Sequence, residues 1–249
     1  VRVVQGDGSV ASSLVEKPFD HIFFTGGGEI GKKIMSTASK HLTPITLELG
    51  GKSPAIVIEG ADLSVTARRL VWGKGLNAGQ TCIAPDHLLI QEPLKAPLIQ
   101  EMKNALRDFY GANPLKSLHL AKIVNDNQFQ RLKNLLNSAK QKGQILAGGE
   151  LDEDERRITP TLIEIEDRND PLMEEELFGP LMPILSIKSL EMAIKDICYQ
   201  PRPLALYMFG GTAQDQQDLL ERTSSGGVCF NDVVIQAGIP ELPFGGIGP

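Results

Sequence analysis

The chain has 249 residues, of which 41% are apolar and 22% are charged, a composition typical of globular proteins. The net charge is −6 and Lys and Arg form no cluster, which argues against a nucleic-acid or anionic-membrane surface. The three cysteines, Cys82, Cys198 and Cys229, are far apart and show no CxxC spacing, so neither a disulfide framework nor a metal site is expected. Sparse cysteine favours a reducing compartment, and we expect a cytoplasmic protein.

Strand and helix patterns alternate along the chain. In chain order they predict a strand at 19–24, a helix at about 29–40, strands at 45–49 and 55–58, a helix capped by Asp62, a strand at 87–91, helices at 94–106, 129–139 and 190–197, and strands at 204–209 and 228–230. The charged run 151–157 is expected to be a solvated loop. This alternation indicates an α/β fold with a largely parallel sheet.

The glycine pair Gly50-Gly51 is a candidate domain boundary, giving domains 1–51 and 52–249. The first part holds about two βα units, which are too few to close a sheet and bury both of its faces. The chain also begins at Val1 in an apolar-alternating stretch and stops at Pro249 in an expected loop. We therefore expect a piece of a longer chain.

A glycine turn follows the first predicted strand. Gly26, Gly28 and Gly31 fit the spacing G-x-G-x-x-G between a strand and a helix, where backbone N–H groups can face a pyrophosphate. Glu48 lies 20 positions after Gly28 at a strand end, where a dinucleotide site places its ribose ligand. A tight strand-to-helix turn without a ligand is the alternative, so the pattern alone leaves a plain dinucleotide-binding module open.

Glu48 allows a second interpretation. The stretch Glu48 to Pro54 places a carboxylate at a strand end, and the neighbours Leu47 and Leu49 would desolvate it and raise its pKa toward that of a general base. A strand-terminal Glu in water is the commoner case. The sequence does not choose between a base, a ribose ligand and a solvated side chain.

Cys82 stands in the loop NAGQTCIAPD, residues 77–86. Taken alone, a cysteine is more often a buried structural residue than a nucleophile. Its neighbours Gly79, Gln80 and Thr81 are small or polar, however, so a reactive thiol with a nearby backbone N–H and a carboxylate base could perform acyl chemistry. A protease dyad with His87 is disfavoured, because His87 opens an apolar strand.

Four other residues receive structural interpretations. Trp72 is expected in the core, on the inner face of the helix that Asp62 caps, and Cys198 and Cys229 are expected to be packing residues. Asn231 follows a predicted strand and is expected to be a turn residue, with a contact to substrate as the alternative.

Five motifs in one order give the chain its resemblance to the aldehyde dehydrogenase family. They are FFTGGGEIGK at 23–32, ELGGKSP at 48–54, NAGQTC at 77–82, EEELFGP at 174–180 and FGGIG at 244–248. The form GQTCIAPD resembles the class 3-like branch, which acts on fatty and aromatic aldehydes. The resemblance implies a catalytic domain preceded by the end of a Rossmann-like coenzyme domain. It also implies that the N-terminal part of the coenzyme domain and a C-terminal tail are absent.

The resemblance also implies residue roles. Cys82 would attack the aldehyde to form a thiohemiacetal and then a thioester, and Glu48 would activate the water that hydrolyses it. The cofactor would be NAD or NADP, lying against Thr25, Gly26, Gly27 and Gly31. Leu49 and Gly50 would lie beside it, Glu176 would hold the nicotinamide ribose and Phe178 would line its pocket.

The resemblance has limits as well as implications. Gly27 departs from the Ser or Asn common in the family, which removes a side-chain contact near the cofactor. The family's second oxyanion donor, an Asn side chain, would lie upstream of Val1. The resemblance implies an aldehyde substrate and a homodimer for a full-length chain. An inactive fragment with a structural or oligomerisation role is the alternative function.

Overall fold

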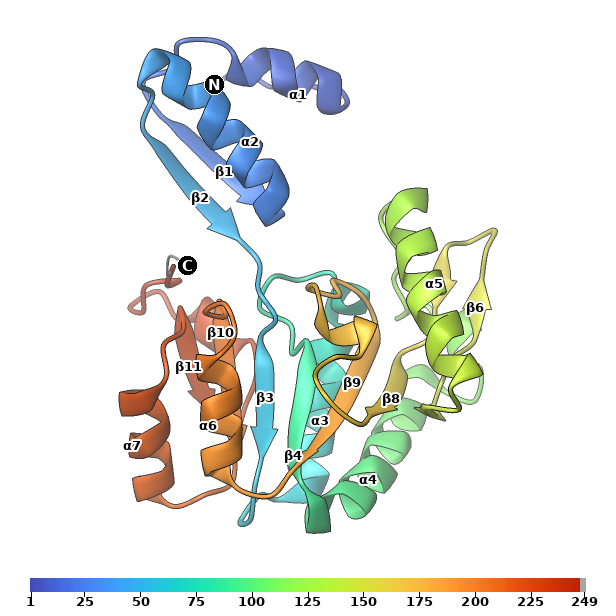
Figure 1. The fold of residues 1–249 in the computed structure, drawn as a ribbon. Coiled ribbons are helices and arrows are strands. Elements are labelled where there is room, and N and C mark those ends of the chain that lie inside the picture. The colour runs from blue at the N-terminus through green and yellow to red at the C-terminus, as the bar shows by residue number, and fades with distance from the viewer. Residues whose placement is uncertain (247–249) are drawn as a thin grey trace. The chain divides into compact units, whose positions relative to one another are not determined.

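The computed structural model describes residues 1–246. The chain divides into two compact units, Val1–Gly50 and Gly51–Pro249 (Figure 1). Ile247 and Gly248 of the FGGIG motif lie outside the described residues.

The first unit is a small βαβ arrangement. Its elements are α1 (Gly8–Val15), β1 (Ile22–Gly26), α2 (Gly28–Ala38), the 3₁₀ turn η1 (Ser39–His41) and β2 (Ile45–Leu49). The two strands pair in parallel, with Thr25 opposite Glu48 and Gly26 opposite Leu49. The predicted strand at 19–24 begins later, at Ile22, because β2 lies alongside only from that residue onward. Helix α1 was not predicted.

Gly31 lets α2 lie directly on β2. A Cβ atom added at Gly31 would lie 3.0 Å from Cδ2 of Leu49 and 3.5 Å from Cδ1 of Leu47. Leu47 and Leu49 therefore face the helix, and the alternation of a strand places Glu48 on the opposite face of the two-stranded sheet.

The second unit contains a seven-stranded sheet in the order β11-β10-β3-β4-β9-β8-β5. All neighbouring strands run parallel except β5, which pairs antiparallel with β8 at one edge. The predicted α/β fold with a largely parallel sheet is confirmed. The strands are β3 (Pro54–Val57), β4 (His87–Gln91), β5 (Ile145–Ala147), β8 (Thr161–Ile165), β9 (Leu181–Ile187), β10 (Ala205–Phe209) and β11 (Gly227–Phe230).

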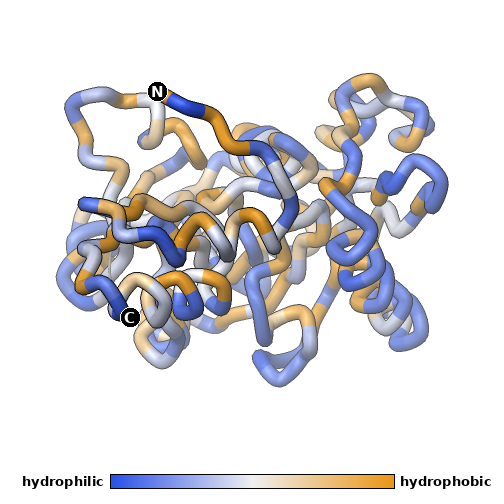
Figure 2. The backbone as a smooth tube through the Cα atoms, turned by 90° about the horizontal axis from the view of Figure 1, so that it is seen from above, coloured by the Kyte–Doolittle hydropathy of each residue, from blue (hydrophilic) through white to orange (hydrophobic). Residues whose placement is uncertain are grey.

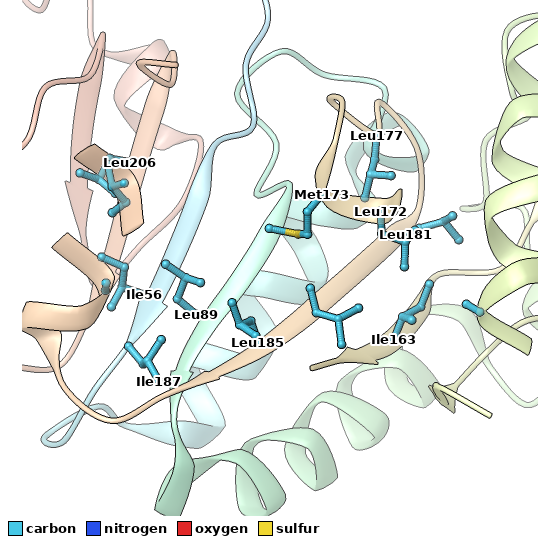
Figure 3. Packing of buried hydrophobic residues seen from close by; sticks show 14 of the residues in the cluster. Ile56, Leu89, Ile163, Leu172, Met173, Leu177, Leu181, Leu185, Ile187 and Leu206 are labelled. Atoms are coloured by element: carbon cyan, nitrogen blue, oxygen red, sulfur yellow. The ribbon is translucent and has the colours of Figure 1, made fainter. Parts of the chain in front are cut away.

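Helices cover both faces of this sheet (Figure 1). Residues of α5, α6 and α7 share an apolar cluster with Ile56 and Leu89 on one face, part of which Figure 3 shows. Residues of α3 and α4 share a second cluster with Ala55 and Val57 on the other face. The α-helices are α3 (Leu63–Gly75), α4 (Glu92–Tyr110), α5 (Asp126–Gln141), α6 (Leu190–Cys198) and α7 (Ala213–Arg222). Short 3₁₀ turns are η2 (Leu76–Gly79), η3 (Pro114–Lys116), η4 (Pro171–Met173) and η5 (Ile235–Gly238).

Three predictions about individual segments are wrong. Segment 151–157 is not a plain loop, because β6 (Leu151–Asp152) pairs antiparallel with β7 (Arg157–Ile158) and Leu151 packs on the core. Trp72 is 44% exposed, because Ala67, Leu70 and Val71 form the inner face of α3. Cys198 is exposed at the end of α6, where its thiol donates to the Arg222 carbonyl, whereas Cys229 is half-buried beside the core.

Apolar residues occur as short stretches along the whole chain (Figure 2). Among the residues that the structure describes, no helix is long and apolar enough to cross a membrane.

The cap of α3 provides a test of this fold. The Asp62 carboxylate accepts a hydrogen bond of 3.1 Å from the Val65 N–H. Replacing Asp62 with Ala leaves that N–H without its partner, so we expect the free energy of unfolding to fall by about 1 kcal/mol. Urea denaturation measures the change. Gln130→Ala, on the exposed face of α5, is the control and should change stability by less than about 0.5 kcal/mol.

Candidate active site

Cys82 lies in the loop between α3 and β4, residues 77–86, which we call the cysteine loop. The loop opens with three successive residues in left-handed backbone conformation, Asn77, Ala78 and Gly79, at φ of 51°, 53° and 73°. A left-handed conformation costs a residue with a Cβ atom about 1–2 kcal/mol. Contacts with other segments must therefore hold this conformation, a pattern found at functional sites.

The Gln80 side chain supplies part of that support. Its Nε2 donates to the carbonyl oxygens of Asn77 at 2.9 Å and Lys122 at 3.0 Å, and its Oε1 accepts from the Val124 N–H at 2.8 Å. Gln80 is itself buried, so these bonds are shielded from water. One amide thus joins the start of the cysteine loop to the segment before α5.

Cys82 occupies the second position of a turn. The Ala84 N–H donates to the Thr81 carbonyl at 2.9 Å, which closes the turn around Cys82 and Ile83. Cys82 is half-buried and packs against the apolar cluster on the α3 and α4 face of the sheet, whereas Ile83 is buried within it. Cys82 as a residue is therefore not fully enclosed in the core.

The motif EEELFGP forms a turn that packs on the cysteine loop; we call residues 174–180 the Glu176 turn. The Leu177 N–H donates to Oδ1 of Asp86 at 2.8 Å. A Cβ atom added at Gly79 would lie only 2.2 Å from the Gly179 carbonyl oxygen, so the two backbones touch at a glycine. Phe178 is 36% exposed and has a φ of 45°. The structure thus brings the segments of Cys82, Glu176 and Phe178 together.

A buried ion pair joins these two segments to the start of β3. The Lys52 Nζ lies 2.5 Å from Oδ2 of Asp86, and the two side chains are only 15% and 3% exposed. The same ammonium donates to the carbonyl oxygens of Leu172 at 2.8 Å and Glu175 at 2.9 Å. Lys74, also buried, points its Nζ at the Asp86 carbonyl at 3.4 Å.

Burial shifts the ionisation of two groups beside this pair. It raises the pKa of Glu176 to about 7, helped by the negative charge of Asp86 and opposed by the Gly51 N–H and by Lys74 and Lys52. It lowers the pKa of Lys74 to about 8, opposed by Asp86. A carboxyl group whose pKa lies near neutrality in a partly covered turn is a candidate functional group.

His87 takes part in a different set of contacts. Its ring is buried, and burial with nearby Lys52 and Arg168 holds its pKa well below the usual value. Its Nε2 lies 3.2 Å from the Arg168 guanidinium, and its Nδ1 lies 3.9 Å from Asp86. These contacts give no support to a Cys–His dyad.

The remaining predicted residues lie in the first unit. Thr25 and Gly26 end β1, Gly27 precedes α2 without a side-chain cap, and Glu48 and Leu49 end β2 just before Gly50. Thr25 and Glu48 are neighbours across the strand pair. Burial raises the pKa of Glu48, and its Oε1 is buried without a hydrogen-bond partner.

Two groups of predicted site residues are therefore each brought together within their own unit. Because Glu48 and Cys82 belong to different units, their convergence stays a prediction. Within the described residues, no group of three or more His, Cys, Asp and Glu side chains could hold a metal ion.

Sequence reasoning missed Lys52, Asp86 and Lys74, which support the site. Lys52 and Asp86 stand inside motifs that the sequence analysis quoted, and that position was the available signal. Charged residues are usually exposed, so nothing in the sequence indicated that these three would be buried together.

The raised pKa of Glu176 predicts a pH dependence of stability. Between its usual pKa of 4.5 and about 7, Glu176 keeps a proton in the folded state that it releases in the unfolded state. The free energy of unfolding therefore falls as pH rises through that window. Glu176→Gln removes the effect. The variant should gain about 1–3 kcal/mol relative to the parent chain between pH 5 and pH 8, measured by urea denaturation. Glu174→Gln, at an exposed neighbour, should show no such trend, and parallel curves for both variants would contradict the prediction.

Comparisons with known proteins agree with the motifs. The model of the aldehyde dehydrogenase family matches residues 1–249. The dimeric NADP-preferring aldehyde dehydrogenase of Rattus norvegicus is 44% identical over 246 residues, which are 99% of this chain and 53% of the relative. The 4,4'-diaponeurosporen-aldehyde dehydrogenase of Staphylococcus aureus is also 44% identical, over 100% of this chain and 54% of the relative. The chain thus spans about half the length of these relatives.

Solved structures give the same result. A substrate-bound structure of Staphylococcus aureus AldH superposes with a TM-score of 0.95 at 43% identity and covers 98% of this chain and 53% of its own. An NADP complex of glyceraldehyde-3-phosphate dehydrogenase from Bacillus halodurans gives a TM-score of 0.83 at 29% identity, covering 93% of this chain and 48% of its own. With its full length matched by the family model, and with the fold shared, this chain belongs to the aldehyde dehydrogenase family.

Proposed function

We propose that this chain carries the catalytic site of an NAD(P)-dependent enzyme that oxidises an aldehyde to a carboxylic acid. The observation that carries the proposal is the half-buried Cys82, held on a strained loop against the Glu176 turn. A structural cysteine would not require three successive left-handed residues beside it. A nucleophile that must keep one orientation would justify that cost.

Cys82 performs the first step in this proposal. Its thiolate attacks the carbonyl carbon, forming a C–S bond and leaving the electron pair of the C=O bond on oxygen. A backbone N–H in the cysteine loop stabilises this oxyanion. The adduct is a thiohemiacetal, and its oxidation gives a thioester on Cys82. Covalent catalysis thereby divides one difficult oxidation into two easier steps.

Glu48 performs the last step. As a general base it takes a proton from the water that attacks the thioester, and the Cys82 thiolate leaves. Its support is the raised pKa and the Oε1 without a partner, since a base needs proton affinity and a free lone pair. The ribose-ligand interpretation of Glu48 is set aside in favour of this role.

The described residues also fit a dinucleotide. The N-terminus of α2 has no side-chain cap at Gly27, and Cβ atoms at Gly27 and Gly28 would meet nothing within 4 Å, which leaves room for a phosphate. Glu176 would hold the nicotinamide ribose and Phe178 would line its pocket, with Thr25, Gly26, Gly31, Leu49 and Gly50 beside the dinucleotide. When bound, NAD or NADP supplies the acceptor for the hydride that oxidation releases.

Substrate, assembly and compartment are proposed on separate grounds. A fatty or aromatic aldehyde is proposed as substrate, because the form GQTCIAPD at residues 79–86 resembles the class 3-like branch. One relative is named dimeric, and a homodimer is proposed for the full-length protein. A cytoplasmic location is proposed from the sparse cysteine alone.

The first experiment replaces Cys82 with Ala. Oxidation of a long-chain and of an aromatic aldehyde, followed as NADH or NADPH formation, should fall by at least about a thousandfold because the covalent route is lost. Cys198→Ala, at an exposed cysteine, is the matched control and should keep full activity. If the unaltered protein shows no oxidation with either cofactor, the proposed activity fails and the interpretation as an inactive fragment gains support.

The second experiment replaces Glu48 with Gln. Thioester formation should survive, whereas hydrolysis should slow by about 100-fold to 10,000-fold through loss of the general base. Rapid mixing should therefore show a burst of about one reduced cofactor per Cys82, followed by slow turnover. A slow reaction without a burst would assign Glu48 to an earlier step and contradict the proposed role.

A further inference from the structure

The Tyr207 hydroxyl links the cysteine loop to another part of the site. Tyr207 lies on β10, an inner strand next to the edge strand β11; it is fully buried and belongs to the apolar cluster against which Cys82 packs. Its hydroxyl donates to the Ile83 carbonyl at 2.5 Å. The same oxygen accepts a hydrogen bond from Nε2 of Gln236 at 3.2 Å.

The Tyr207 hydroxyl contacts a strained segment that follows β11. Residues 231–238, which we call the β11 loop, contain Asn231 at a φ of 56° and Val234 at a φ of 68°. A β-branched residue in the left-handed region is a genuine outlier that its surroundings must hold in place. The Tyr207 hydroxyl bonds to Gln236 of this loop, and the Arg69 guanidinium pairs with Asp232 at 3.3 Å.

The same hydroxyl also contacts the turn that carries Cys82. That turn is closed by the hydrogen bond from Ala84 to Thr81, and the Tyr207 hydroxyl fixes the carbonyl of Ile83, the residue after Cys82. Burial raises the pKa of Tyr207 to about 12, so the hydroxyl remains a donor at neutral pH. The rigid phenol ring projects from β10, and its hydroxyl contacts both the cysteine loop and the β11 loop.

We propose that Tyr207 is a positioning residue for Cys82, holding the peptide groups around the nucleophile in the orientation that acyl transfer requires. The inference rests on the proposed function, because it assigns Tyr207 to the chemistry of that cysteine. Attack on a carbonyl needs the thiolate and an oxyanion donor in fixed relation, and small misplacements reduce such rates by up to about 100-fold. Alkylation of the same thiolate needs no oxyanion donor.

This difference defines the experiment, which uses the full chain and needs no cofactor. With p-nitrophenyl acetate, the Cys82 thiolate forms a C–S bond while the ester C–O bond breaks and p-nitrophenolate leaves. Tyr207→Phe should lower this acylation rate at least about tenfold. Alkylation of Cys82 by iodoacetamide, followed by mass spectrometry of its peptide, should change by less than about twofold.

Two further variants keep the test decisive. Tyr110→Phe removes the hydroxyl of another tyrosine in the same apolar cluster, and it should leave both rates unchanged. Gln236→Leu removes one donor to the Tyr207 oxygen, so it should lower acylation by a smaller factor even if Tyr207→Phe folds poorly. Thermal denaturation of each variant reports its stability.

The outcomes separate this inference from the proposed function. If the parent chain shows no acylation that depends on Cys82, the proposed function fails and the inference with it. If the parent chain is acylated and the variants at Tyr207 and Gln236 match it in both reactions, only the inference is overturned. An equal loss of acylation and alkylation would assign Tyr207 a structural role and would also overturn it.

Discussion

The ion pair between Lys52 and Asp86 is the interaction on which the candidate site depends. Lys52 lies two residues before β3 and Asp86 lies directly before β4, and their partners Leu172, Glu175 and Leu177 precede β9. The pair therefore holds together three segments that enter neighbouring parallel strands. Breaking such a pair by removing one partner costs about 3–5 kcal/mol, because the other charge stays buried without compensation.

Its position gives the site an unusual place on the sheet. Open parallel sheets commonly bind ligands at the carboxyl ends of their strands. Here the cysteine loop and the Glu176 turn both lie at the amino ends, where each segment enters its strand. No helix N-terminus is needed to hold them, because the partly buried Lys52 and the buried Asp86 and Gln80 fix their backbone groups instead.

Much of the sheet could be predicted from the sequence, because its buried strands are short continuous apolar runs. The predicted strands at 55–58, 87–91 and 204–209 agree with β3, β4 and β10 to within one residue at each end. The strand β9 escaped prediction, since Pro183 lies inside a central strand, where a missing N–H is normally unfavourable. For the site, the motifs located Cys82 and Glu176. The buried charges that support them depend on distances between remote segments, which periodicity does not encode.

The contact between Gly79 and Gly179 has a consequence for how the protein folds. The left-handed start of the cysteine loop is unfavourable by itself, and its support comes from residues far along the chain, at Lys122, Val124 and Gly179. Contacts between such distant residues carry a large loop-closure entropy and are made slowly. Cys82 therefore reaches its final geometry only after these distant segments have come together.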